Sequence, residues 1–438
     1  MAKRVVVSGA KEMSQNAEVA DQILVIGAGM AGIEASLTLA AAGKNVYLVE
    51  REPLFGGQAI KCEEVFANME CATCMAAPMQ QEVLQNERIE LLTLSDIKEV
   101  QGVAGDFTAK ITKRARYVDS EACIGCNACF DPCPVSLPNT FEEDLGERKA
   151  IYISCPGALP NVPAIDTENC VRFAGEECNL CQEACMFEAI DFDQKDEEIE
   201  VRVSAIIVAT GYDLQDVSQI AGVEYTESGN VYTAREMERL YASNGPTEGK
   251  IVLRSGKEPT SAAIVHCVGR EDIGYCSAVC CMYSFKFVHY LTDKLPEIKL
   301  YEFVSDLCIP GKSYQAFYEK LKDKAQITRF QNLAISQQDD TATISFQTPS
   351  GEDNTLEVDM VILAPAIVPA KGASELAEVL GIRYGEAGFY GTESGIQSGV
   401  DSGRQGVYLA GCAQGPKDIA RSITQASAAV GRLLASTD

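Results

Sequence analysis

Residues 22–32 have the sequence QILVIGAGMAG, and this stretch decides the fold. Its first half is a short apolar run, typical of a buried parallel strand. Its second half places Gly27, Gly29 and Gly32 in GxGxxG spacing and leads into a helical pattern. The next apolar run, NVYLVE, ends in Glu50. This order predicts a dinucleotide-binding unit, in which the glycines let a pyrophosphate approach the helix N-terminus and the acid binds ribose hydroxyls.

Three further segments indicate that the dinucleotide is FAD. Two glycines follow shortly after the acid, residues 205–211 are AIIVATG, and residues 406–411 are GVYLAG and precede an amphipathic helix. These pieces occur together in flavoproteins with two dinucleotide domains, which usually carry Asp where this chain has Cys412, so that contact stays open. The residues expected to bind FAD are Gly27, Gly29, Met30, Ala31, Gly32, Glu50, Arg51, Gly57, Gln58, Ala209, Thr210, Gly211, Gly411, Gln414 and Lys417.

Eight cysteines between these segments predict iron–sulfur clusters. The first run has the C-x2-C-x2-C-x3-C-P spacing of bacterial ferredoxins, whose fourth cysteine binds the neighbouring cluster. A partner run follows about forty residues later, with its first gap stretched. A disulfide framework predicts no such spacing. By the ferredoxin arrangement, Cys123, Cys126, Cys129 and Cys185 hold one 4Fe-4S cluster, and Cys133, Cys170, Cys178 and Cys181 hold the other.

The positions of these motifs divide the chain. We expect an α/β flavoprotein with two dinucleotide-type domains and an inserted two-cluster ferredoxin module. The FAD domain takes 20–116, 195–225 and 362–438, the insert 117–194, and a second, NAD-like domain 226–361. The candidate NAD turn, AAIVHCVGREDIG at 262–274, lacks GxGxxG and a well-placed acid. We therefore expect that nicotinamide binding has been lost there.

Composition limits the partners and the compartment. The chain has 438 residues, a net charge of −26, 18 cysteines and two histidines. Its acidity argues against binding nucleic acid or anionic lipid directly. It shows no secretory signal and no apolar stretch long enough to cross a bilayer. We expect a cytoplasmic protein with reduced thiols, whose membrane association, if any, runs through a partner.

Five longer motifs carry a resemblance to a known family. They are CATCMAAPM at 71–79, RYVDSEACIGCNACFDPCPV at 116–135, DLGERKAIYI at 144–153, HCVGRED with YCSAVCC at 266–281, and LAGCAQGPKDI at 409–419. From near Gln22 to its end the chain resembles the flavin A subunit of heterodisulfide reductase. Its compact length is similar to the A-type flavin subunit of the quinone-interacting membrane-bound oxidoreductase, and to short reductase-like subunits of sulfur oxidisers.

The resemblance implies a thioredoxin-reductase-like core that carries the inserted ferredoxin. It also implies work in anaerobic energy metabolism, inside a complex with flavin, cluster or membrane quinone-reactive subunits. A homodimer stays open.

The remaining cysteines allow three interpretations. Cys71 and Cys74, with Cys276, Cys280 or Cys281, would hold a third, irregular iron–sulfur cluster. Alternatively, the C-x2-C pair forms a redox disulfide beside the flavin, or these thiols, with Cys62, are small buried hydrophobes. For Cys155, Cys267, Cys308 and Cys412 we expect the last of these.

Two functions follow from these features. The first is an electron-relay subunit, in which FAD exchanges two electrons and the clusters pass single electrons. The alternative is a stand-alone NAD(P)H-dependent disulfide reductase with Cys71 and Cys74 as its catalytic pair. The weak NAD motif and the absence of a histidine after His289 favour the relay.

Overall fold

The computed structural model describes residues 19–226, 228–391 and 399–436. Three separated stretches of chain build one parallel five-stranded sheet, in the order β24-β13-β1-β2-β5. Its strands are β1 (Gln22–Ile26), β2 (Asn45–Val49), β5 (Ile89–Leu92), β13 (Ala205–Val208) and β24 (Val407–Leu409). The central strand β1 is buried at every position, as its unbroken apolar sequence predicts.

The two faces of this sheet are covered differently. Ile23 and Val25 pack toward helices α1 (Met30–Ala41) and α9 (Ile419–Leu434). Leu24 and Ile26 pack toward an antiparallel sheet of β6 (Ser95–Val103), β7 (Asp106–Lys113) and β12 (Glu197–Val203), and toward α8 (Ala373–Leu380). Successive residues of a strand point to opposite faces of the sheet, so β1 contributes side chains to the hydrophobic cores on both faces.

A second parallel sheet, ordered β15-β22-β16-β17-β18, forms the other large domain. Its strands are β15 (Val231–Thr233), β16 (Ser261–Val268), β17 (Lys299–Val304), β18 (Gln326–Arg329) and β22 (Met360–Pro365), with an antiparallel sheet of β19 (Gln331–Gln338), β20 (Thr341–Gln347) and β21 (Asp353–Val358). The helices are α4 (Ala234–Tyr241), α5 (Arg270–Ile273), α6 (Cys280–Lys294) and α7 (Tyr314–Leu321). The expected boundary at residue 361 falls inside β22, which pairs with β15 and β16, so we place it after Pro365.

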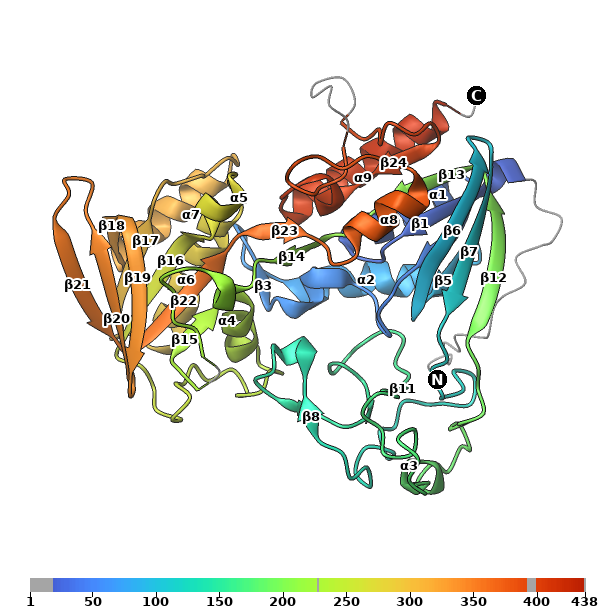
Figure 1. Cartoon of the computed structure of the whole chain (residues 1–438), viewed down its shortest axis with the longest axis horizontal. Helices are drawn as coiled ribbons and strands as arrows, with labels where there is room; N and C mark the ends of the chain where they lie inside the picture. Colours follow the sequence, from blue (N-terminus) through green and yellow to red (C-terminus); the bar gives the residue numbers. More distant parts are fainter. Residues whose placement is uncertain (1–18, 227, 392–398, 437–438) are drawn as a thin grey trace.

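Two short paired strands connect the domains. β14 (Tyr212–Leu214) leaves the FAD domain, and β23 (Ile367–Pro369) returns beside it in antiparallel pairing. They lie between the two domains in Figure 1. Helix α2 (Ala72–Gln85) and the hairpin of β3 (Glu64–Val65) and β4 (Glu70–Cys71) lie close to this connection in the same view.

The segment between β7 and β12 forms a small module at the bottom of Figure 1. Its regular elements are β8 (Leu137–Pro138), β9 (Glu147–Arg148), β10 (Ile151–Tyr152), β11 (Ala164–Ile165) and α3 (Leu180–Glu183). Its core combines a few aliphatic residues, such as Val118 and Ile190, with six of the ferredoxin-run cysteines. A module this small rarely has enough apolar core to be stable alone, and bound metal is a common remedy.

Among the described residues, no helix is both long enough and apolar enough to cross a membrane.

Candidate functional site

In the glycine turn after β1, only one of the three glycines could carry a Cβ without a clash. Gly27 has φ +97°, and a Cβ there would lie 2.5 Å from the carbonyl oxygen of Ala209. A Cβ on Gly32 would lie 1.8 Å from the carbonyl oxygen of Gly27. On Gly29, which has φ −77°, the nearest protein atom to a Cβ would be 3.7 Å away. Gly27 and Gly32 are thus required by the fold, whereas the fold itself does not require glycine at position 29.

Glu50, directly after β2, accepts a hydrogen bond from this turn. Its Oε2 accepts a hydrogen bond from the backbone N–H of Ala28 at 2.9 Å, and its Oε1 accepts one from Glu52 at 3.1 Å. Burial raises the pKa of Glu50, and these bonds oppose the shift. Each carboxylate oxygen keeps a further acceptor position. Glu50 therefore positions the loop, a role that the sequence did not reveal, and retains capacity for a ribose hydroxyl.

The other residues expected at FAD border the same turn or the flavin end. Met30 and Ala31 begin α1, and residues 209–211 follow β13. The glycine pair at 56–57 contacts the turn, because the N–H of Gly56 donates a hydrogen bond to Ala28 O at 2.8 Å. Arg51 Nη1 donates to Lys371 O at 2.9 Å. Gln58 Oε1 is buried and accepts no hydrogen bond from the described residues, so it is an acceptor available to a ligand.

The glycine-containing segment at residues 406–411 precedes α9 and packs against α1. A Cβ on Gly411 would lie 2.9 Å from Cβ of Ala31, so the segment packs directly on α1. Cys412 Sγ points inward, 3.3 Å from Lys417 O, and burial raises its pKa. Gln414 accepts a hydrogen bond from Gln425, and Lys417 Nζ donates to Gly415 O at 3.2 Å. Cys412 is thus a buried thiol, as expected.

The ferredoxin cysteines line two separate hollows of the inserted module. One hollow is lined by Cys123, Cys126, Cys129 and Cys185, together with Ile124 and Phe187. The other is lined by Cys133, Cys170, Cys178 and Cys181, together with Val135 and Leu180. Each group takes cysteines from both runs, in the crossed grouping that the spacing predicts. Desolvation raises the pKa of Cys129 to about 12 and that of Cys181 to about 11, so these thiols stay protonated without a bound cation.

The hollows suit a four-iron cluster better than a single ion. No three His, Cys, Asp or Glu side chains in the described part of the chain converge on a point that one metal ion could occupy. A 4Fe-4S cluster does not need such convergence, because each thiolate binds a different iron atom. Four cysteines around a hollow are the arrangement that such a cluster requires.

Five cysteines gather in the second domain, and two of them were not expected there. Cys280 and Cys281 begin α6, and Cys281 Sγ accepts the N–H of Cys308 at 3.4 Å. Cys267 interacts electrostatically with Cys280, and Cys276 with Cys308. Cys267 and Cys308, which we expected to be small buried hydrophobes, therefore lie within this group, and Cys308 packs against Cys280 and Cys281. Cys267 lies near the carboxyl end of β16 and Cys308 follows β17, and these neighbouring parallel strands end at the same edge of the sheet.

A buried histidine and a buried glutamate lie beneath this group. His266 and Glu302 have no exposed surface, and His266 Nε2 lies 3.5 Å from Glu302 Oε1. Burial would lower the pKa of His266, but Glu302 and Cys281 outweigh it and raise the pKa to about 10. Cys280 and His266 lower the pKa of Cys281 to about 4, although desolvation opposes the shift. Cys281 thus carries the thiolate character of a metal ligand or a nucleophile.

Cys71 and Cys74 form a separate pair at the start of α2. Cys71 Sγ accepts the N–H of Cys74 at 3.2 Å and lies 3.3 Å from Thr73 Oγ1. Cys74 is exposed. The hydrogen bonds of this pair join residues of the same turn, whereas Cys281 also contacts Cys280 and Cys308. Cys62 and Cys155 are enclosed thiols whose pKa burial raises, as expected of structural cysteines.

This fold and these sites define a flavoprotein with two dinucleotide-type domains and a cysteine-rich insert. The chain belongs to the FAD dependent oxidoreductase family, whose model matches residues 22–251. It is similar to thioredoxin reductases of known structure from T. acidophilum (TM-score 0.52, 11% identity, covering 95% of this chain and 99% of that one) and from Lactococcus lactis (TM-score 0.53, 14% identity, 95% and 98%). At this identity the likeness shows the fold alone.

Curated relatives are much closer in sequence. The A subunit of the "H(2):CoB-CoM heterodisulfide,ferredoxin reductase" of Methanothermobacter marburgensis is 40% identical over 423 residues, covering 94% of this chain and 63% of the relative. An iron-sulfur A subunit of the "CoB--CoM heterodisulfide reductase" of Methanopyrus kandleri is 40% identical over 425 residues, covering 95% and 64%. The chain spans less than two thirds of the length of these relatives.

Proposed function

We propose that this oxidoreductase is the FAD- and iron–sulfur electron-transfer subunit of a multisubunit, heterodisulfide-reductase-like complex. The observation that carries the proposal is the grouping of the ferredoxin cysteines into two hollows, each lined by four of them. The relatives' names, as subunits of reductases of a heterodisulfide, support it. When bound, FAD exchanges electrons in pairs and four-iron clusters exchange them singly. Together these cofactors connect two-electron donors or acceptors with one-electron donors or acceptors.

The chain's own residues would bind and orient these groups. The missing side chain at Gly29 lets the pyrophosphate approach the backbone, Glu50 fixes the loop, and the unpartnered Gln58 oxygen supplies an acceptor. In the insert, the two cysteine sets hold the two clusters. We propose a third cluster in the second domain, held by four of Cys267, Cys276, Cys280, Cys281 and Cys308. It replaces the expected set that combined Cys71 and Cys74 with the second-domain thiols.

A direct measurement tests the number of clusters. Purified anaerobically and reconstituted to saturation, the chain is expected to bind one FAD and about twelve irons, four for each cluster. Eight irons would remove the third cluster from the proposal. Four would overturn the pairing of the two ferredoxin runs.

The second candidate, an NAD(P)H-dependent disulfide reductase, keeps one supporting observation. The hydrogen bonds to Cys71 from Cys74 and Thr73 outweigh its desolvation and lower its pKa, as in a reactive thiol. Against it, α5 after β16 has only four residues, and the second-domain cysteines occupy the position where an NAD-binding helix would begin. This strand end therefore lacks the helix N-terminus that a pyrophosphate needs.

Stopped-flow mixing with NADH and with NADPH separates the two functions. We expect little reduction of the flavin by either nucleotide, and ready reduction by a chemical reductant. Rapid bleaching of FAD by a nucleotide, with a long-wavelength charge-transfer band that Cys74→Ala abolishes, would replace the relay with a disulfide reductase.

A further inference from the structure

An exposed apolar patch covers one of the two cysteine hollows. Seven large apolar side chains are exposed in the described part of the chain, and five of them belong to the insert. Ile124 is 46% exposed, Met186 88% and Phe187 42%. Ile124 and Phe187 line the hollow of Cys123, Cys126, Cys129 and Cys185, and Met186 lies between Cys185 and Phe187 in sequence. We call these three residues the Met186 patch.

The surroundings of this patch are acidic. The insert, residues 117–194, contains fifteen Asp and Glu and three Lys and Arg, a net charge of −12. Twelve of the acids are exposed, among them Glu183 and Glu188 on either side of Met186. All three basic side chains in this fully described stretch are only half-exposed. Two of them have polar partners: Arg148 forms an ion pair with Asp166, and Arg172 donates a hydrogen bond to Asn179. The exposed charge of the insert is therefore mostly negative, and two of its exposed acids flank Met186 in sequence.

The patch also lies where electrons would leave the molecule. Cys126, one of the four cysteines of the hollow, is exposed. In Figure 1 the adjoining helix α3 lies at the outer end of the insert, away from both large domains. An apolar centre with a charged rim is the usual composition of a protein-binding surface, and an exposed apolar patch on a soluble chain marks one.

We propose that the Met186 patch docks a one-electron carrier protein whose own surface has basic residues around an apolar centre. This rests on the proposed function, because the cysteines beneath the patch must hold a redox cluster. Opposite charges steer the two proteins together, and the apolar centre sets how long they stay in contact. Electron transfer then breaks no bond and moves no proton.

Anaerobic stopped-flow mixing tests the proposal on the intact, cofactor-loaded chain. The chain is photoreduced and mixed with ferric cytochrome c, a strongly basic protein with an apolar haem edge, as the probe. Ferric haem gains one electron and the chain loses one. We expect a fast second-order reaction that slows steeply as salt is added, because screening weakens the steering.

Two variants separate charge from apolar contact. Glu183→Lys with Glu188→Lys should slow the reaction about tenfold at low salt and flatten its salt dependence. Met186→Ser should slow it and keep the salt dependence. The matched controls lie in the FAD domain: Glu378→Lys on the exposed face of α8, and Val103→Ser at the 71% exposed end of β6. Both should react like the wild type.

Iron content and the electron paramagnetic resonance signals of each reduced variant distinguish the possible failures. Fewer than eight irons in the wild type would overturn the proposed function itself. If the clusters are loaded and reducible, but the insert variants match the two controls, the docking surface alone is wrong. Equal rates with cytochrome c and with an acidic flavodoxin would also overturn it.

Discussion

Gly29 differs from Gly27 and Gly32 in what a side chain at its position would contact. At Gly27 and Gly32 a Cβ would collide with backbone, whereas at Gly29 it would enter the space assigned to the FAD pyrophosphate. The GxGxxG motif therefore contains two glycines that the fold needs and one that, on the proposed function, FAD needs. A single set of substitutions can separate these two requirements.

Gly29→Ala is expected to fold and to lose FAD, because its φ suits an L-residue and 3.7 Å is an ordinary contact. Gly32→Ala is expected to misfold. Gly431→Ala, in helix α9 with open space around its Cβ, is the control that should retain flavin. Absorbance at the flavin band and circular dichroism report the two properties. Full flavin in Gly29→Ala would place the binding pocket elsewhere.

Asp359 makes the stability of the second domain depend on pH. Its Oδ2 accepts hydrogen bonds from Thr260 N and Oγ1, both at 2.7 Å, and from Ser261 N at 3.0 Å. Burial would raise the pKa of Asp359, but these bonds outweigh it and lower the pKa. The stabilisation is therefore present above the unfolded pKa, near 4, and is lost as the pH falls through the lower folded value.

Asp359→Asn should reduce the free energy of unfolding by about 1 kcal/mol at pH 7, a modest value because the site is partly exposed. The difference between variant and wild type should shrink below pH about 4, where Asp359 itself becomes protonated. Denaturant unfolding at pH 7 and below pH about 4 measures this difference in the free energy of unfolding. An equal difference at both would contradict the role given to the carboxylate.

At the scale of elements, short loops rather than helices hold the insert's chemistry. Its one α-helix, α3, has four residues and carries Cys181, and the other seven cysteines of the two runs lie on loops around the two hollows. Since Pro134 follows Cys133 directly, the first run ends with that thiol turned toward the hollow of the second run. Cys133 and Cys185 are the two thiols that cross between the runs.

Cys133→Ser is therefore expected to damage the cluster of Cys170, Cys178 and Cys181 and to spare the other. Cys185→Ser should have the reverse effect, and Cys155→Ala, a buried thiol outside both hollows, should affect neither. Iron content and electron paramagnetic resonance of the reduced proteins identify the lost cluster. Loss of the first run's own signal in Cys133→Ser would mean that the grouping is not crossed.

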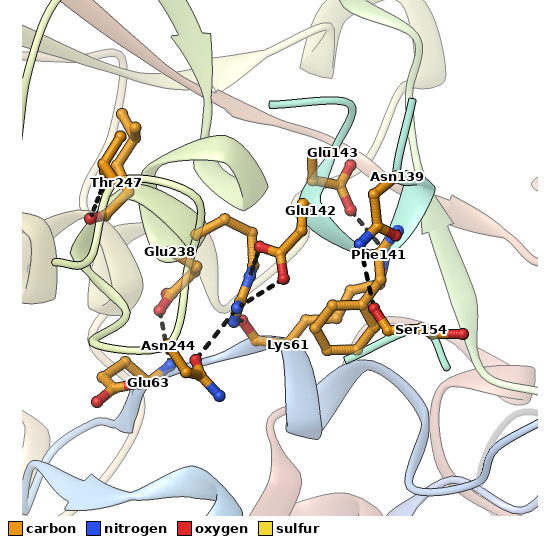
Figure 2. Close-up of polar contacts among 12 residues, drawn as sticks. Lys61, Glu63, Asn139, Phe141, Glu142, Glu143, Ser154, Glu238, Asn244 and Thr247 are labelled. Atoms are coloured by element: carbon orange, nitrogen blue, oxygen red, sulfur yellow. Dashed lines mark hydrogen bonds and ion pairs between the residues drawn. The ribbon is translucent and has the colours of Figure 1, made fainter. Parts of the chain in front are cut away.

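At the scale of the molecule, one buried ion pair joins the insert to the second domain. Arg239 of α4 is 2% exposed and binds Glu142 of the insert, at 2.7 Å from Nε to Oε2 and 3.2 Å from Nη2 to Oε1. It also donates to Lys61 O of the FAD domain at 3.2 Å. Figure 2 shows the labelled residues of this junction coming from all three parts of the chain. The pair therefore fixes the insert relative to both large domains.

Removing one member of this pair leaves a buried charge, so Arg239→Met should lower the free energy of opening of residues 139–145 by about 3 kcal/mol. Arg239→Met with Glu142→Gln should cost less than the two single changes together, because no charge then stays unpaired. Hydrogen exchange of these amides measures the opening. Lys110→Met, which breaks an exposed pair with Glu99, should leave it unchanged. Additive losses in the double variant would argue against direct coupling.

The sequence by itself determined the features that are local along the chain. The turn at Gly27–Gly29–Gly32 and the two ferredoxin runs are set by spacing, because a tight turn or a cluster needs particular residues at fixed short separations. The double role of Glu50, the arrival of Cys267 and Cys308 beside Cys281, and the Arg239–Glu142 pair were decided by the tertiary structure. Each depends on residues that only strand order and domain docking bring together, for example the adjacency of β16 and β17. Contacts across such separations leave no periodic or spacing signal in one sequence, since no local geometry constrains the distance along the chain.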